Sequence, residues 1–128
     1  MKNIHIIGIV GSLRKKSINL SLMKGFAAQI PEGSTLEIAD ISDIPLFNQD
    51  MEADFPAVVT ALKEKIRKAD AVIVITPEYN RSIPGVLKNV IDWTSRPYGD
   101  GAWVGKPMLV AGATEGALGT AVAQSHLK

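Results

Sequence analysis

The sequence predicts an α/β domain built on a parallel β-sheet. Short apolar runs rich in β-branched residues, typical of strands buried on both faces, alternate with segments whose apolar residues recur at helical spacing. Strands that alternate with helices form parallel sheets through right-handed crossovers. The length of 128 residues favours a single domain over residues 1–128, which is large enough to bury its own core.

The first half of the chain supplies two predicted strands and two predicted helices. Residues 4–10 form an apolar run that predicts a buried strand, and apolar positions over 17–30 follow the helical period up to a Pro-Glu-Gly stop. Residues 35–41 alternate as a second strand. A long polar loop over 42–56, with an apolar patch inside it, then leads to a helix at 57–69.

The second half continues the alternation. Residues 71–76 are the clearest buried strand of the chain, and a polar loop over 77–82 follows them. Pro84 sits where the first turn of a helix tolerates proline, so a helix that runs through Trp93 is expected. Residues 107–113 predict a fourth strand, which is followed by a turn and by the start of another helix.

The composition excludes several classes of protein. The chain has no cysteine, which excludes disulfides, thiolate catalysis and cysteine-bound zinc or iron–sulfur centres. Its 14 basic and 13 acidic residues give a net charge of +1, and no basic run predicts nucleic-acid binding. The apolar run near the N-terminus is too short for a membrane span, and no signal-peptide cleavage pattern follows it. We therefore expect a cytoplasmic protein with no nucleic-acid or membrane partner.

A polar turn between the first predicted strand and helix has the residues of a phosphate-binding loop. It contains Gly11, Ser12, Arg14, Ser17 and Asn19. The N-terminus of a helix offers unpaired backbone N–H groups and a positive dipole end to an anion. Hydroxyl and amide side chains can donate hydrogen bonds, and a guanidinium adds a charge-assisted contact. The simpler interpretation is that Ser17 only caps the helix and that Arg14 is a surface charge.

Two better-known nucleotide loops are not found in this turn. It has neither the Gly-x-x-x-x-Gly-Lys-Ser/Thr pattern of NTPases nor the Gly-x-Gly-x-x-Gly pattern of dinucleotide-binding folds. Asp40 follows the second predicted strand, where a dinucleotide-binding fold places its ribose-binding acid. Without the glycine pattern, Asp40 is interpreted as a loop residue.

The loop after the third predicted strand has the features of a site for a flat ring such as a flavin. Prolines and a glycine over residues 77–85 make it stiff and compact. A planar ring needs a flat slot and hydrogen-bond partners along its polar edge. Backbone N–H groups of Glu78, Tyr79 and Asn80 could supply those partners, and the Tyr79 ring could pack near the face. Alternatively, Ser82 caps the following helix and Glu78 is a solvated charge.

The two loops are expected to meet at one edge of the sheet. In open parallel sheets the ligand crevice lies beyond the carboxyl ends of the strands, where the strand order reverses. In the flavodoxin-like order 2-1-3-4-5 that point lies between the first and third strands. Both loops leave the carboxyl ends of these two strands, so they are expected to flank one crevice.

Together the two motifs resemble those of a known family. Gly-Ser-Leu-Arg-x-x-Ser-x-Asn at 11–19, paired with Pro-Glu-Tyr-Asn-x-Ser-x-Pro-Gly-x-Leu-Lys-Asn-x-Ile-Asp-Trp at 77–93, is similar to the NADPH-dependent FMN reductase family, which includes quinone, azo and chromate reductases. The resemblance covers essentially the whole chain. It implies a flavodoxin-like three-layer sandwich that binds FMN non-covalently. It also implies hydride transfer from NADPH or NADH through the flavin to a small-molecule acceptor: a quinone, an azo compound, chromate or free flavin.

The resemblance further implies which residues hold the cofactor. The first motif would contact the phosphate and ribityl groups through Ser12, Arg14, Ser17 and Asn19. The second would frame the isoalloxazine ring through Pro77, Glu78, Tyr79, Asn80 and Ser82. Thr114, in the turn after the fourth strand, is also included among the expected cofactor-binding residues. No side chain is expected to be an essential acid or base, since the flavin carries the chemistry.

The family also implies an assembly and a longer sheet. Its members form dimers or tetramers, and Asn89, Asp92 and Trp93 are the expected contact residues here. Relatives usually continue with a fifth strand and a last helix, whereas this chain ends within the fourth helix. The expected strand order is therefore 2-1-3-4, with the fourth strand as an exposed apolar edge. Val122 and Ser125 stand where many relatives have an arginine and an aromatic residue.

Two other functions remain open at this point. One is a flavodoxin-like electron carrier without reductase activity. Such carriers tend to be strongly acidic, which the net charge of +1 argues against. The other is a shortened chain that folds but binds FMN weakly, because the outer strand and helix are missing.

Overall fold

Four parallel strands form a sheet in the order β2-β1-β3-β4, which confirms the predicted topology. The computed structural model describes residues 2–128. Its helices and strands are β1 (Ile4–Val10), α1 (Ile18–Ala28), β2 (Ser34–Ile38), the short 3-10 helix η1 (Gln49–Met51), α2 (Ala57–Lys68), β3 (Ala71–Ile75), α3 (Gly85–Thr94), β4 (Met108–Ala111) and α4 (Ala121–Leu127).

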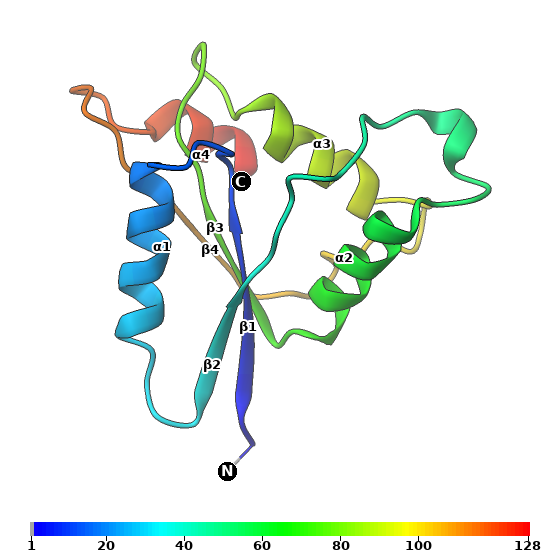
Figure 1. Ribbon diagram of the computed structural model, residues 1–128, viewed down its shortest axis with the longest axis horizontal. Coiled ribbons are helices and arrows are strands. Elements are labelled where there is room, and N and C mark those ends of the chain that lie inside the picture. The colour runs from blue at the N-terminus through cyan, green and yellow to red at the C-terminus, as the bar shows by residue number, and fades with distance from the viewer. Residues whose placement is uncertain (1) are drawn as a thin grey trace.

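Helices cover both faces of the sheet and give a three-layer sandwich. Figure 1 shows α1 on one side of the strands and α2 and α3 on the other. Successive residues of a strand point to opposite faces, so Ile7 and Ile9 of β1 belong to the core under α2 and α3, whereas Val10 packs with Met23 of α1. At Gly8 a Cβ would lie only 2.8 Å from the Met23 sulfur, so this glycine allows α1 to approach β1 closely.

A side chain of the polar turn caps the N-terminus of helix α1. Ser17 is the N-cap, and its hydroxyl oxygen accepts a hydrogen bond from the N–H of Leu20 at 3.2 Å. The helix ends at Ala28, two residues earlier than the apolar period predicts, because the N–H of Gln29 closes a tighter turn on the carbonyl oxygen of Phe26.

Gly25 gives a prediction about the stability of α1. It is an exposed residue inside the helix, and a Cβ built on it meets nothing within 4 Å. Gly25→Ala is therefore expected to raise the free energy of unfolding by about 1 kcal/mol, since alanine restricts the unfolded chain and favours the helix. Urea unfolding of the variant and the parent measures the difference. A loss of stability would contradict the helix geometry described.

The long loop between β2 and α2 is anchored on α3 by aromatic packing. Trp93 is fully buried, its Nε1 donates to the carbonyl oxygen of Pro45 at 2.7 Å, and its ring meets Phe47 and Phe55 edge-on. The Asn89 side chain donates to the same carbonyl oxygen and accepts the N–H of Phe47. Trp93 is therefore a core residue of its own chain, and the expectation that it is a subunit contact is wrong.

Three strands are shorter than the sequence predicts, and β3 is the least affected, since it ends at Ile75 and not at residue 76. The predicted strand 35–41 ends at Ile38, because the chain then turns at Asp40, whose carboxylate accepts the N–H and the hydroxyl of Ser42. This turn confirms Asp40 as a loop residue. β4 covers four residues rather than the predicted 107–113, and its side chains Met108 and Leu109 are 41% and 44% exposed, as expected of an apolar edge strand.

The carboxylate of Asp70 joins the chain just before β3 to the start of β1. It accepts the backbone N–H of His5 at 2.9 Å and pairs with the Lys2 ammonium. The hydrogen bond from His5, followed by that from Lys2, holds the pKa of Asp70 below its usual value. A carboxyl with a lowered pKa in the folded state stabilises the fold above its unfolded pKa, and this contribution is lost as the pH falls through the folded value.

Asp70→Asn tests this pH dependence. The variant is expected to be less stable than the parent at neutral pH and to lose less stability on acidification, because it has no carboxylate to protonate. Urea midpoints measured at pH 7 and at about pH 3 give both quantities, since the relevant window lies below the unfolded pKa of roughly 4. An equally steep fall in the midpoint for both proteins would contradict the assignment.

No helix in the range 2–128 has the length and apolar character that a membrane crossing requires.

Candidate functional site

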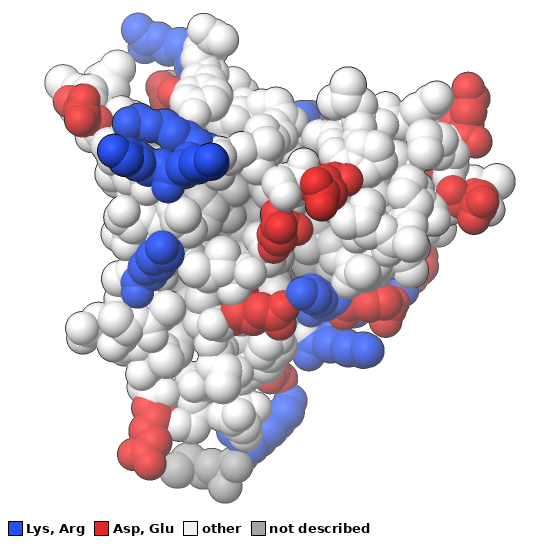
Figure 2. Space-filling view, viewed as in Figure 1, with Lys and Arg blue, Asp and Glu red and all other residues white. Residues whose placement is uncertain are grey.

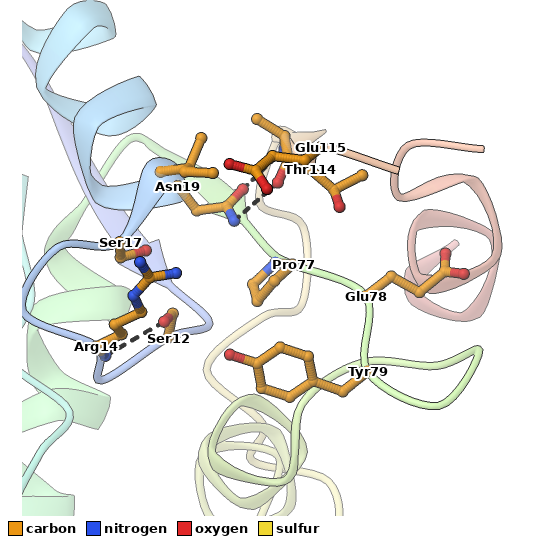
Figure 3. A pocket seen from close by; sticks show the side chains of 11 residues that line it. Ser12, Arg14, Ser17, Asn19, Pro77, Glu78, Tyr79, Thr114 and Glu115 are labelled. Carbon is orange, nitrogen blue, oxygen red and sulfur yellow. Dashed lines mark hydrogen bonds between the residues drawn. The ribbon is translucent and has the colours of Figure 1, made fainter. Parts of the chain in front are cut away.

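A cavity lies at the carboxyl edge of the sheet, where three loops meet (Figure 3). The loops follow β1, β3 and β4, and the cavity between them measures about 190 Å³. It lies beside the point where the strand order reverses, between β1 and β3. Its lining residues are Ser12, Arg14, Ser17, Ile18, Asn19, Pro77, Glu78, Tyr79, Ala113, Thr114 and Glu115.

The loop after β1 is a compact turn that presents donors to the cavity. Gly11 extends the sheet by donating its N–H to the Ile75 carbonyl oxygen at 2.8 Å. The N–H of Arg14 is directed to the Ser12 hydroxyl at 3.3 Å, and the N–H of Ser17 reaches the Arg14 carbonyl oxygen at 3.1 Å. Figure 3 shows the Arg14 side chain beside Ser12 and Ser17 at one end of the cavity. Ser17 both caps α1 and lines the cavity, so the two interpretations of this residue are compatible.

The positive charge at this end of the cavity is not neutralised by neighbouring carboxylates. Arg14, Lys15 and Lys16 are consecutive, exposed residues, and Figure 2 shows basic side chains gathered over this part of the surface. Within residues 2–128, none of the three takes part in an ion pair. An exposed basic cluster beside a helix N-terminus suits an anionic group such as a phosphate.

Asn19 ties the first loop to the end of β4. This residue is 3% exposed, its Nδ2 donates to the Ala113 carbonyl oxygen at 3.1 Å, and its Oδ1 accepts the Ala113 N–H at 2.8 Å. The amide therefore holds two walls of the cavity together across 94 positions of sequence. The expectation that Asn19 also contacts a ligand stays a prediction.

The loop after β3 is a tight two-residue turn. Tyr79 and Ser82 pair through both backbone hydrogen bonds, each 3.0 Å long, with Asn80 and Arg81 between them at φ 50° and 61°. Positive φ at both central positions is the geometry of the tight turns that join antiparallel strands. The turn directs the Tyr79 ring along the cavity, beside Pro77 (Figure 3).

Two polar side chains of this turn point away from the cavity, toward α4. The Glu78 carboxylate accepts the N–H groups of Val122 and Ala123, and the Ser82 hydroxyl lies 2.9 Å from Nδ1 of His126. Ser82 does not cap α3 as the alternative interpretation proposed, because α3 begins at Gly85 with no side-chain cap. Glu78 is likewise not a solvated charge.

The cavity thus brings together eight of the ten expected residues. Asn80 and Ser82 lie outside its lining. Ile18, Ala113 and Glu115 also line the cavity and were not predicted. Ala113 and Glu115 flank the predicted Thr114, so their place in the turn after β4 was the available signal. No cluster of three or more histidine, aspartate or glutamate side chains that could hold a metal occurs within residues 2–128.

Comparison with known proteins matches residues 4–128 to the model of one family, described as NADPH-dependent FMN reductase. A 2-hydroxy-1,4-benzoquinone reductase from Burkholderia is 48% identical over 98% of this chain and 68% of its own length. A quinone reductase from Escherichia coli is 41% identical over 99% of this chain and 69% of its own length. Among solved structures, the flavoenzyme NAD(P)H:acceptor oxidoreductase FerB from Paracoccus denitrificans superimposes with a TM-score of 0.92 at 46% identity, covering 98% of this chain and 69% of FerB. The chain therefore spans about two thirds of the length of these relatives.

Proposed function

Because the chain belongs to the NADPH-dependent FMN reductase family, we propose that its cavity binds FMN and that the protein passes a hydride from NADPH or NADH through the flavin to a quinone. FMN is the cofactor of this family and NAD(P)H is its hydride donor. The observation that carries the assignment to this cavity is the meeting of a basic polar turn and a tyrosine-lined loop at the point where the strand order reverses.

The residues at the basic end of the cavity fit the phosphate of FMN. The hydroxyls of Ser12 and Ser17 accept backbone N–H groups and still have a hydrogen to donate, and Arg14 has no carboxylate partner among the described residues. Gly11 is closely packed, since a Cβ there would lie 3.1 Å from both the Leu87 side chain and the Thr76 hydroxyl. We propose that Ser12, Arg14 and Ser17 hold the phosphate.

The opposite walls fit a flat ring and the ribityl chain. Pro77 is buried and Tyr79 is half exposed at the cavity, so they supply apolar surface beside the backbone of the turn. The N–H of Tyr79 is already bonded to the Ser82 carbonyl oxygen, so the expectation that it meets the ring is wrong. We propose that the N–H groups of Glu78 and Asn80 meet the polar edge of the isoalloxazine, and that Asn19 and Thr114 border the ribityl chain. The volume of about 190 Å³ is below the roughly 300–1,000 Å³ typical of small-molecule pockets, so these walls enclose only part of the cofactor.

The residues of the cavity would bind and orient FMN, and the bound flavin would supply the capacity to take up a hydride from NAD(P)H and to pass two electrons to an acceptor. Among the lining residues, the Glu78 carboxylate is already bonded to α4, and Arg14 serves the phosphate. We propose that no lining side chain acts as an essential catalytic acid or base, because the flavin carries the chemistry.

The acceptor class is a small molecule, and we propose a quinone. Support comes from the relatives named quinone reductase, including those of Pseudomonas putida and E. coli. We further propose that residues 1–128 belong to one domain of a cytoplasmic protein, because its hydride donor is a cytoplasmic nucleotide. A homodimer or homotetramer is proposed as well, as the family resemblance implies.

Steady-state oxidation of NADPH and of NADH by the FMN-loaded protein, with a benzoquinone as acceptor, tests the proposed reaction. Turnover well above that of the same concentration of free FMN is expected. An electron carrier would give a rate no higher than free FMN, and that result would contradict the proposal.

A further inference from the structure

Glu78 lines the cavity, but its carboxylate is directed at α4 (Figure 3). One carboxylate oxygen, Oε2, accepts the N–H groups of Val122 at 2.9 Å and Ala123 at 3.0 Å. Both are first-turn groups of α4, which have no partner inside the helix. The carboxylate therefore acts as an N-terminal cap supplied from another loop, 44 and 45 positions earlier in the chain.

Helix α4 has no cap of its own. Thr120 precedes it but makes no capping hydrogen bond with its side chain. A negative charge beside the positive end of a helix is favourable, so Glu78 both satisfies two donors and interacts with the helix dipole. At the other end of α4, His126 contacts Ser82 of the same turn, so the turn and the helix are joined at two places.

The segment that α4 anchors also forms a wall of the cavity. Ala113, Thr114 and Glu115 line the cavity a few residues before α4 begins, and Asn19 fixes Ala113 from the other side. Glu78 thus connects the wall after β3 with the wall after β4. The backbone of Glu78 follows strand β3 and precedes the hydrogen-bonded turn 79–82.

We propose that Glu78 is a positioning residue for the flavin ring, which it does not contact through its carboxylate. By bonding to α4, the carboxylate holds the backbone of residues 78–80 in the orientation that meets the ring, and it holds the wall 113–115 opposite. A loop that is ordered before binding costs less free energy to fix around a ligand. The inference rests on the proposed function, since it requires that FMN occupies this cavity.

Removing the carboxylate by Glu78→Ala and weakening it by Glu78→Gln test the proposal through flavin affinity. Fluorescence titration of the flavin-free proteins gives dissociation constants for FMN and for riboflavin, which lacks the phosphate. The lost contact orients the loop that faces the ring, which both flavins have, so both dissociation constants are expected to rise by a similar factor. In Glu78→Ala this factor is expected to be about tenfold, which corresponds to the free energy lost with a helix cap. Glu78→Gln keeps an oxygen acceptor and is expected to rise by a smaller factor.

Glu115→Gln is the matched control for charge. Glu115 is an exposed carboxylate at the rim of the same cavity, and in the described part of the chain it makes no hydrogen bond to α4. Simple repulsion predicts that removal of either carboxylate tightens the binding of the FMN phosphate. If Glu78 positions the loop, Glu78→Gln is instead expected to weaken FMN binding. Weaker binding in that variant but not in Glu115→Gln supports the proposal.

Thermal unfolding of the flavin-free variants separates positioning from stability. If Glu78→Ala does not fold, the comparison rests on Glu78→Gln, which keeps the size of the side chain. Unchanged dissociation constants, with or without a lower Tm, would overturn the proposal, and so would weaker binding of FMN but not of riboflavin. A parent protein that binds neither flavin would instead contradict the proposed function.

Discussion

A methyl group added at Gly112 is expected to be among the most damaging single changes in this protein. A Cβ at this position would lie 2.2 Å from the Thr76 carbonyl oxygen and 2.2 Å from the Thr120 hydroxyl oxygen. The first of these is a backbone atom beside a paired strand, because the N–H of Thr76 bonds to Ala111 at 3.0 Å. The chain at Gly112 must therefore move away from β3, at the point where β4 leads into the cavity wall.

Gly112→Ala should thus affect both the fold and the site. Overpacking against atoms that cannot move is expected to lower the free energy of unfolding by about 3 kcal/mol or more. Flavin affinity should fall as well, because Ala113, Thr114 and Glu115 follow directly. Urea unfolding measures the first effect, and FMN titration at a temperature where the variant is folded measures the second.

Gly116→Ala is the matched control for this change. It lies in the same segment, has no positive φ, and a Cβ there meets only the Thr114 hydroxyl at 3.7 Å, an ordinary contact. Its free energy of unfolding is expected to stay within about 0.5 kcal/mol of the parent value. Equal losses in the two variants would contradict the close approach of Gly112 to β3.

Arg14→Ala is expected to weaken FMN binding by at least about tenfold, since a hydrogen bond to a charged group contributes roughly 1.5–3 kcal/mol. The guanidinium lines the basic end of the cavity and has no carboxylate partner in the described chain, so it is free to pair with the phosphate. Riboflavin has no phosphate, and its affinity should change little. Titration of the parent and the variant with both flavins gives the comparison.

Lys16→Ala controls for the charge of the same turn. Lys16 is exposed and does not line the cavity, so its removal takes away one positive charge but no direct contact. A loss of FMN affinity of no more than about threefold is expected, because charges that lie in water are screened. If Arg14→Ala and Lys16→Ala weakened FMN binding equally, general electrostatic attraction would explain the site better than a specific contact.

The strands with the strongest sequence patterns were predicted best. β1 has the predicted bounds, because a continuous apolar run marks a strand that is covered on both faces. β2 was predicted too long, since Ala39 and Ile41 are buried and prolong the apolar pattern although the chain has already left the sheet. In β1 the buried residues are also the residues that pair in the sheet. After Ile38, Ala39 and Ile41 stay buried but are no longer part of the strand, and an apolar sequence pattern indicates burial alone.

The parts of the candidate site that consist of residues close together in the sequence were predicted. The turn after β1 combines donors and charge within a few positions, so its residues could be grouped from the sequence alone. The direction of the Glu78 side chain could not be predicted, because its partners are the backbone of a helix 44 positions away. The tight turn that follows Glu78 could not be predicted either, because its two residues with positive φ, Asn80 and Arg81, are not glycines.

The absorption spectrum of the purified protein tests the central claim most directly. After incubation with FMN and removal of unbound flavin, the protein is expected to retain the visible absorption of oxidised flavin in about equimolar amount. Adding NADPH without oxygen should bleach that absorption, and a benzoquinone should then restore it. A protein that retains no flavin, or retains flavin that NAD(P)H does not reduce, would contradict the proposal that this cavity is the FMN site of a reductase.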